Sequence, residues 1–202
     1  EEIYQKFDEL SLTAYQPSLY LEVNKKKARK GAAKDWDDNV NRERFLVKMM
    51  GVLFMKRLES SWYSCMTTVK KVLDVHESTL KLALEFKEKG GNGTISTSGG
   101  EGNTDFDDEE IDDLIDEAYS LRKGTIKLSD MQNLGGFIRN LQMDVNKLKE
   151  IYKNFEAFAA AYEAGEETDL KLEELVKILK EKKKAKNKKV VIFTAFADTA
   201  RF

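Results

Sequence analysis

The sequence predicts a mainly α-helical protein in which long antiparallel helices form a coiled-coil-like arm or bundle. Charged residues make up 35% of the 202 residues while the net charge is only -2, a balance typical of long solvated helices. The chain holds a single proline, Pro17, so few positions interrupt a helix. A four-heptad apolar repeat spans 134–162. A short C-terminal β-strand is predicted as part of a truncated α/β lobe.

The first forty residues carry a weak strand signal followed by a basic stretch. Leu10, Leu12 and Ala14 alternate with polar residues, which predicts a short strand that ends before Pro17. Residues 24–40 are rich in lysine and lack any periodicity, so we expect them to form a linker.

Residues 41–87 have a helical pattern throughout. An unbroken helix of this length would reach about 70 Å, far beyond the radius of a compact domain. The segment is therefore either one protruding arm or two helices, broken near Gly51 or at Ser60–Ser61. The predicted apolar stripe consists of Phe45, Met49, Val52, Leu53, Leu58, Trp62, Met66, Val69, Leu73, His76 and Leu80.

The middle of the chain is a glycine-rich linker followed by an acidic block. Residues 90–102 read GGNGTISTSGGEG and lack the lysine and the preceding strand of a phosphate-binding loop. Residues 101–117 contain ten acidic and no basic side chains. The tetrad DEAY at 116–119 is close to a Walker B motif, but it falls in a helical pattern rather than at the tip of a buried strand. We interpret it as a coincidence.

The heptad repeat gives the clearest helix, with Ser129 or Asp130 as the expected N-cap and Gly165 as the expected C-cap. Its apolar positions should pack against the helical segment 41–87 in antiparallel orientation. These positions are Leu134, Ile138, Leu141, Val145, Leu148, Tyr152, Phe155, Ala159 and Tyr162.

The C-terminal segment predicts one more helix and half of a βαβ unit. Thr168 or Asp169 should cap the helix, which buries Leu172, Leu175, Val176 and Leu179. A lysine-rich run leads to Val190–Thr194, an apolar and β-branched run typical of a strand buried on both faces. Asp198 is then the expected N-cap of a helix starting at Thr199. Because parallel strands need neighbours, we expect this ending to belong to a longer polypeptide.

The composition excludes several kinds of site. Cys65 is the single cysteine and His76 the single histidine, so neither a disulfide framework nor a histidine–cysteine metal site can form, and no catalytic constellation is evident. A reducing, cytoplasmic setting is the default expectation. No apolar run of about 18 residues predicts a membrane span.

Several stretches resemble, in order, the region that joins the two motor lobes of bacterial superfamily-two helicases, in particular the Swi/Snf-like DEAD/DEAH-box group. They are LSLTAYQPSLYL, RERFLVKMMGVLFMKRLESS, GTIKLSDM, TDLKLEELVKIL and KKVVIFTAFADTARF. KRLESS and VVIFTAFADTA are the more specific of these. The resemblance implies a connector from the first lobe at 1–40, a helical insertion at 41–167 with a flexible loop at 90–106, and the start of the second RecA-like lobe at 168–202.

The resemblance also implies a function for the parent protein, namely ATP- and Mg²⁺-dependent movement on nucleic acid, with DNA as the first expectation. This chain lacks the Walker A lysine, a DEAH box on a strand and the arginine-finger motif, so it should bind ATP weakly or not at all and should not hydrolyse it. The expected partners are the nucleic acid and the two lobes, and the chain itself should be a monomer or a weak dimer.

Five basic residues are candidates for contact with nucleic acid. Lys56 and Arg57 lie in an otherwise apolar helical stretch, and a salt bridge from Arg57 to Glu59 is the structural alternative. The other three candidates, for which a solvated helix face is the alternative, are Arg42, Arg44 and Lys48.

Thr194 and Phe196 match helicase motif IV, whose strand-end loop faces the inter-lobe cleft; a strand-end and a core role are the alternatives. For the whole chain, the competing hypothesis is a non-enzymatic coiled-coil adaptor that binds a protein partner through its heptads.

Overall fold

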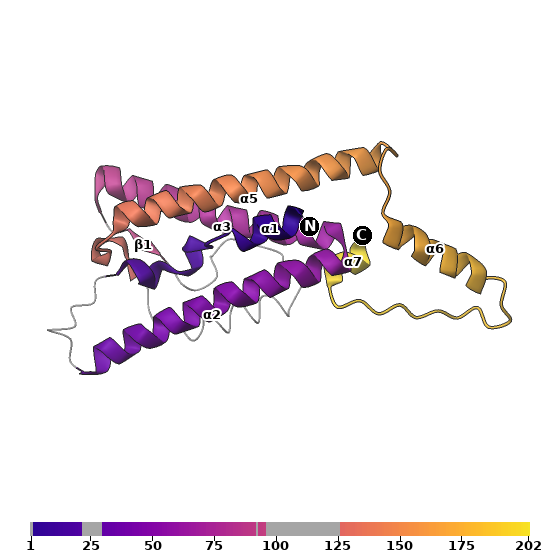
Figure 1. The fold of residues 1–202 in the computed structure, drawn as a ribbon, viewed down its shortest axis with the longest axis horizontal. Helices are drawn as coiled ribbons and strands as arrows, with labels where there is room; N and C mark the ends of the chain where they lie inside the picture. Colours follow the sequence, from indigo (N-terminus) through magenta and orange to yellow (C-terminus); the bar gives the residue numbers. More distant parts are fainter. Residues whose placement is uncertain (1, 22–29, 92, 96–125) are drawn as a thin grey trace.

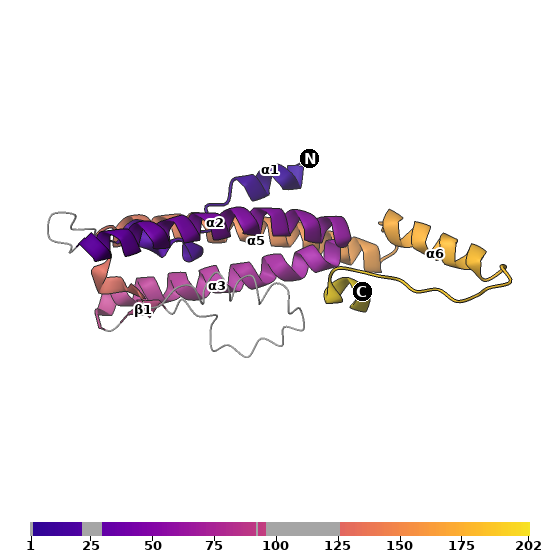
Figure 2. The ribbon, with the colours of Figure 1, turned by 90° about the horizontal axis from the view of Figure 1, so that it is seen from below.

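The computed structural model describes residues 2–21, 30–91, 93–95 and 126–202. Three long helices lie side by side, and each is antiparallel to the next along the chain (Figures 1 and 2). They are α2 (Lys30–Ser60), α3 (Trp62–Lys89) and α5 (Leu134–Glu163). The prediction of a mainly α protein built from long antiparallel helices is confirmed.

The helical segment after residue 41 is broken at Ser60–Ser61, one of the two predicted positions. Ser61 has an extended backbone, and its Oγ accepts a hydrogen bond of 3.0 Å from the N–H of Ser64, which caps α3. Such a cap stabilises a helix by about 1 kcal/mol. At its other end α2 begins at Lys30, inside the segment for which the sequence predicted a linker.

A short antiparallel pair of strands lies between α3 and α5 in the chain. Strand β1 (Thr94–Ile95) pairs antiparallel with β2 (Ile126–Lys127), and the 3-10 helix η3 (Leu128–Asp130) follows. The N-cap of α5 is Asn133, whose side chain accepts from the N–H of Gly136 at 2.9 Å. The prediction of Ser129 or Asp130 as this cap is therefore wrong, because both residues belong to the preceding 3-10 turn. The acidic block, the DEAY tetrad and most of the predicted 90–106 loop lie outside the described residues.

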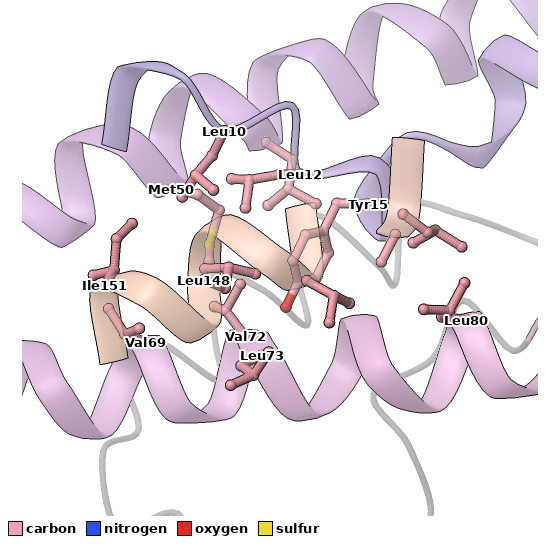
Figure 3. Packing of buried hydrophobic residues seen from close by; sticks show 14 of the residues in the cluster. Leu10, Leu12, Tyr15, Met50, Val69, Val72, Leu73, Leu80, Leu148 and Ile151 are labelled. Carbon is pink, nitrogen blue, oxygen red and sulfur yellow. The ribbon is translucent and has the colours of Figure 1, made fainter. Parts of the chain in front are cut away.

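The core fills the space between the three helices and is closed by the N-terminal segment (Figure 3). The predicted seam of α5 is confirmed: Leu141, Val145, Leu148 and Phe155 are buried, and Tyr152 packs against them. Figure 3 shows part of this packed core, and the labelled side chains are Leu10, Leu12, Tyr15, Met50, Val69, Val72, Leu73, Leu80, Leu148 and Ile151.

The predicted apolar stripe of α2 is right at Leu53 and Leu58, which pack against the core, and wrong at two other positions. Phe45 and Val52, which were assigned to the buried stripe, are 64% and 51% exposed. Met50 and Phe54 are buried instead. The buried face of α2 also carries Glu43 and Arg57, so a pattern built from apolar residues alone selects the neighbouring face.

The N-terminal segment contains helices rather than the predicted strand. After α1 (Glu2–Asp8), whose Phe7 ring stacks on Phe54 at 4.7 Å, the chain forms the 3-10 helices η1 (Thr13–Tyr15) and η2 (Pro17–Tyr20). Leu12 has φ +50°, a left-handed conformation that a strand does not contain. The segment runs along the bundle between α2 and α5 (Figure 1), and the bridge pairing assigned to it among the described residues is the isolated one between Leu21 and Met131.

The C-terminal segment leaves the bundle and returns to it. Gly165, with φ +75°, follows the last turn of α5, and Asp169 caps α6 (Leu170–Lys182) through its carboxylate, as predicted. The four leucine and valine positions predicted to be buried in α6 are half-buried or exposed, because no helix of the described chain covers α6. The chain then runs back as an extended connector to α7 (Ala197–Arg201) (Figure 1).

The predicted C-terminal strand does not form. Val191 and Phe193 are 74% and 91% exposed, and residues 190–194 make no strand pairing within the described chain. A strand requires a neighbour for its backbone hydrogen bonds, and no strand among the described residues pairs with this run. Asp198 is also not an N-cap: α7 begins before it, and Phe196 occupies that position.

Candidate functional site

Two sets of buried and half-buried polar side chains attach the chain's terminal segments to the bundle. We call the first the N-terminal anchor; it comprises Asp144, His76 and Glu43, which hold residues 11–18. We call the second the corner anchor; it comprises Arg57, Ser60, Ser61, Ser64 and Thr67 at the α2–α3 junction, which hold residues 196–199.

Asp144 is the centre of the N-terminal anchor. It projects from α5 and is only 2% exposed. Its two carboxylate oxygens accept hydrogen bonds from the backbone N–H groups of Ser11 at 2.9 Å and Thr13 at 2.7 Å. A carboxylate that accepts backbone N–H groups makes strong, charge-assisted bonds. These two bonds account for the turn at Leu12, since both of its neighbours point their N–H groups at one carboxyl group.

His76 supports the same segment from α3. Its Nδ1 lies 2.8 Å from the carbonyl oxygen of Val72, and its Nε2 accepts from the N–H of Ala14 at 3.4 Å. These contacts require the neutral tautomer with the proton on Nδ1. Burial lowers the pKa of His76, while the Val72 carbonyl and the Asp144 carboxylate, 4.0 Å from Nε2, oppose that shift. His76 is therefore a neutral structural histidine, as its place on the helix face predicted.

Glu43 completes the N-terminal anchor from α2. It is 4% exposed, and its carboxylate accepts from the Ser18 N–H at 3.0 Å and from the Ser18 hydroxyl at 2.5 Å. Nearby, the Asn140 side-chain amide donates to the Tyr20 hydroxyl at 2.7 Å. Each of the three long helices thus contributes a buried polar side chain to one N-terminal segment.

Arg57 is the centre of the corner anchor. Its side chain is buried in the last turns of α2, where Nη1 donates to Asp198 at 2.9 Å and to the Ser64 hydroxyl at 3.0 Å. The guanidinium also lies 4.6 Å from the centre of the Phe196 ring. A desolvated cation over an aromatic ring gains about 2 kcal/mol or more. Arg57 therefore binds an acid from α7, whereas Glu59, the partner considered from the sequence, is exposed.

Hydroxyl groups and an aromatic cluster extend this contact. The Thr199 hydroxyl lies 2.7 Å from that of Ser60 and 3.2 Å from that of Ser61, and Thr67 donates to Asp198 at 3.0 Å. The Phe202 ring stacks on Tyr63 at 5.5 Å and meets Trp62 edge-on at 5.1 Å. The motif KRLESS at the corner and the motif ADTARF at the C-terminus thus form one packed contact.

Lys171, at the start of α6, reaches the same corner. Its Nζ donates to the backbone carbonyl oxygens of Glu59 and Ser60 at the end of α2. A cation at a helix C-terminus satisfies carbonyl groups that have no partner within the helix and interacts favourably with the helix dipole. The corner therefore receives one contact from the beginning of α6 and several from α7.

The structure separates the five basic residues that the sequence singled out. Lys56, Arg42, Arg44 and Lys48 lie on the exposed side of α2, next to the exposed Phe45 and Val52. Arg57 does not share that surface: it is 0% exposed and cannot reach a phosphate in this fold. Arg57 is therefore no candidate for contact with nucleic acid in this fold, because its position on α2 faces the core.

The two residues that resemble helicase motif IV have different surroundings. Phe196 is 7% exposed and lies beneath the Arg57 guanidinium, which matches the core role considered as an alternative. Thr194 is exposed, and its Oγ1 accepts from the Phe196 N–H at 3.3 Å. Thr194 thus shapes the turn that delivers Phe196 to the corner.

Among the described residues, no group of three or more His, Cys, Asp or Glu side chains is arranged to hold a metal ion. Burial raises the pKa of the Cys65 thiol to about 12, so the thiolate needed for nucleophilic chemistry does not form near neutral pH. No helix within the described ranges has the length and apolar character that crossing a membrane requires.

Sequence reasoning missed most of both anchors. It overlooked Asp144, Glu43, Ser18 and Thr13, and it gave Asp198 a capping role. One signal was present: Glu43, Arg57 and Asp144 fall on the inward faces of otherwise apolar helical repeats. A charge at such a position predicts a buried polar partner, because an unpaired buried charge is costly.

Comparisons of this chain with models of protein families, with curated proteins and with solved structures each gave no match. The residues and their geometry therefore carry the functional interpretation.

Proposed function

We propose that this chain is the helical connector between the two RecA-like lobes of an ATP-dependent nucleic-acid motor. In this proposal the bundle positions the lobes, the exposed basic side of α2 contacts the nucleic acid, and the chain performs no catalysis by itself. ATP and Mg²⁺ belong to the lobes of the parent protein.

One observation supports the proposal more than any other: the same bundle holds both segments that would lead to the lobes. The stretch that resembles the exit from the first lobe is held by the N-terminal anchor. The stretch that resembles the start of the second lobe is held by the corner anchor. A rigid body attached to two lobes can transmit a change in their separation, which is how hinged motors use ATP-driven closure.

The surface of α2 supports the contact with nucleic acid. Arg44, Lys48 and Lys56 are spaced by multiples of four residues and lie on neighbouring parts of the exposed side. A row of cations of this kind can follow a phosphate backbone, and its affinity should fall steeply with salt. The chemistry favours a polyanion without base specificity, since the described contacts offer no built site for a base.

Fluorescence anisotropy with labelled duplex and single-stranded DNA, repeated over a salt series, tests this contact. Substituting Lys48→Glu together with Lys56→Glu should weaken binding, and fewer phosphate contacts should reduce its salt dependence. The unfolding free energy should stay within about 0.5 kcal/mol of the parent value, as for other surface changes. A matched control is Lys81→Glu with Lys153→Glu, two exposed lysines on α3 and α5. Equal binding by both double variants would contradict the proposal.

A coiled-coil adaptor is the second candidate, and the exposed face of α6 favours it. The heptads that first suggested an adaptor are occupied within the chain, because Leu141, Val145 and Leu148 pack into the bundle core. A protein partner would therefore bind elsewhere, and α6 presents Leu170, Val176 and Ile178 to solvent. Light scattering of the chain mixed with candidate protein partners distinguishes an adaptor, which forms a mixed complex, from a connector, which does not.

A further inference from the structure

Helix α6 presents an apolar groove to solvent. None of its residues is buried, and Figures 1 and 2 both show it apart from the three-helix bundle. A groove of about 650 Å³ runs along one face of α6 and ends against Tyr162 of α5. Leu172 and Val176 are the apolar side chains of α6 that line it. An apolar surface of this kind favours an occupant with apolar side chains of its own.

The charges around the groove are arranged in order along the helix. Glu167, Asp169 and Glu173 line its first half, and Lys177, Lys180 and Lys184 line its second half, where Glu181 is the exception. The sequence continues the same order beyond the groove: residues 166–174 contain five acids and one lysine, and residues 177–189 contain eight lysines and one acid. The one lysine of the acidic half, Lys171, is bound to the end of α2.

We propose that this groove is a self-association surface in which α6 of a second copy lies antiparallel to the first. A two-fold axis near Val176 places the acidic half of each α6 beside the basic half of the other. The leucine and valine side chains of the two helices then meet at the centre. Such an interface is isologous, so both copies make the same contacts.

The order of the charges favours a second copy over other occupants. A nucleic acid would be attracted by the lysines but repelled by Glu167 and Glu173. A uniformly basic partner would meet the opposite difficulty at Lys177 and Lys184. An antiparallel α6 matches both halves and also supplies apolar side chains for the groove.

The size of the helix sets the strength of the pairing. Thirteen residues of α6 span only about 20 Å. Two such helices bury less than the roughly 1,200 Å² of a stable interface, so the dimer should be weak and concentration-dependent. This inference is independent of the motor function, since a connector and an adaptor can both pair through α6.

Sedimentation velocity of the full chain over a concentration series tests the pairing. The parent chain should shift from monomer to dimer as its concentration rises. Val176→Asp places a charge in the groove and should weaken the dimer by about tenfold or more, equivalent to at least 1.4 kcal/mol. Ile178→Asp is the matched control, because Ile178 is 53% exposed and lies about 200° around the helix from Val176.

Charge reversal gives a second, independent readout. A chain with Lys177→Glu, Lys180→Glu and Lys184→Glu should stay monomeric, as should a chain with Glu167→Lys, Asp169→Lys and Glu173→Lys. Mixing the two should restore a dimer, because each supplies the charge that the other lacks. Circular dichroism checks that both chains remain helical. A parent chain that stays monomeric at every concentration, an equal effect of the two aspartate substitutions, or mixed chains that do not pair would each overturn the proposal.

Discussion

The two anchors hold the two ends of the chain in different ways. The N-terminal anchor lies inside the bundle, where Asp144 and His76 are almost inaccessible to water and their partners are backbone groups of residues 11–14. The corner anchor lies at the bundle's edge, where Arg57 is buried but the Asp198 side chain is 17% exposed. Thr199 and Phe202 add contacts to this corner, and the exposed connector 183–195 links α7 to the preceding α6.

This difference predicts that releasing the N-terminal segment and releasing α7 from the bundle require different free energies. Removing the N-terminal segment uncovers the core side chains Leu10, Leu12 and Tyr15, so the segment should unfold with the bundle. Releasing α7 uncovers Arg57 to water but leaves the three-helix core intact. We therefore expect the N-terminal anchor to unfold only with the bundle, and the corner anchor to open while the bundle stays folded.

The largest effect should follow Asp144→Ala. The substitution leaves the buried N–H groups of Ser11 and Thr13 without an acceptor, at about 1–3 kcal/mol each. We expect a total loss of about 3–5 kcal/mol in the free energy of unfolding, measured by urea denaturation. Asp144→Asn keeps one oxygen acceptor and should lose roughly half as much. If both variants unfolded at the parent's midpoint, the N-terminal anchor would contribute nothing to the fold.

The next effect concerns pH and His76. Because burial lowers its pKa in the fold, the unfolded chain binds this proton more readily than the folded chain. The contribution of neutral His76 to the free energy of unfolding is therefore complete above about pH 6.5, the ordinary pKa of histidine. It decreases as the pH drops below that value. Between pH 6.5 and 5 the loss should be less than about 2 kcal/mol. His76→Gln should remove this part of the pH dependence, and an unchanged slope would place its origin elsewhere.

A smaller change is expected for Asp198→Ala. A buried arginine without its acid would cost about 3–5 kcal/mol if it stayed buried, but release of α7 lets water reach Arg57. The loss in unfolding free energy should therefore stay near 1 kcal/mol, while Trp62 fluorescence changes as Phe202 departs. Asp74→Ala removes the exposed pair with Lys70 and is the matched control, with no change in Trp62 emission expected. A loss as large as that of Asp144→Ala would make the two anchors equivalent.

The smallest change is expected for Phe202→Ala. The ring contacts Tyr63, Trp62 and Tyr162, and aromatic pairs contribute about 0.5–1.5 kcal/mol beyond buried area. The substitution should weaken the docking of α7 and leave the bundle's urea midpoint nearly unchanged. Trp62 emission and its quenching by iodide measure the docking. A clear decrease in the midpoint would indicate that the C-terminus belongs to the core.

The sequence predicted the fold where packing follows a repeat, and it missed positions that depend on contacts between distant segments. The seam from Leu141 to Phe155 was predictable because its heptad positions are apolar, whereas the buried Asp144 beside them was missed. The buried face of α2 was not fully predictable, since Glu43 and Arg57 face inward toward Ser18 and Asp198. Their partners lie in segments that no local pattern places beside α2.

The predicted strand 190–194 illustrates the same limit. Its composition describes what its side chains favour, but a strand forms only where a neighbouring backbone lies beside it. The corner anchor was predictable only in part: KRLESS and ADTARF were singled out separately, and folding brings them together through Arg57 and Asp198.

Amide hydrogen exchange of the parent chain and of Asp198→Ala tests most directly whether the two ends are held independently. The account predicts that the substitution removes protection from the amides of residues 199–202 and leaves those of Ser11, Thr13 and Ser18 at the parent's rates. Simultaneous loss of protection at both ends would show that the bundle and α7 open together, and would contradict a corner that releases one segment while the bundle stays folded.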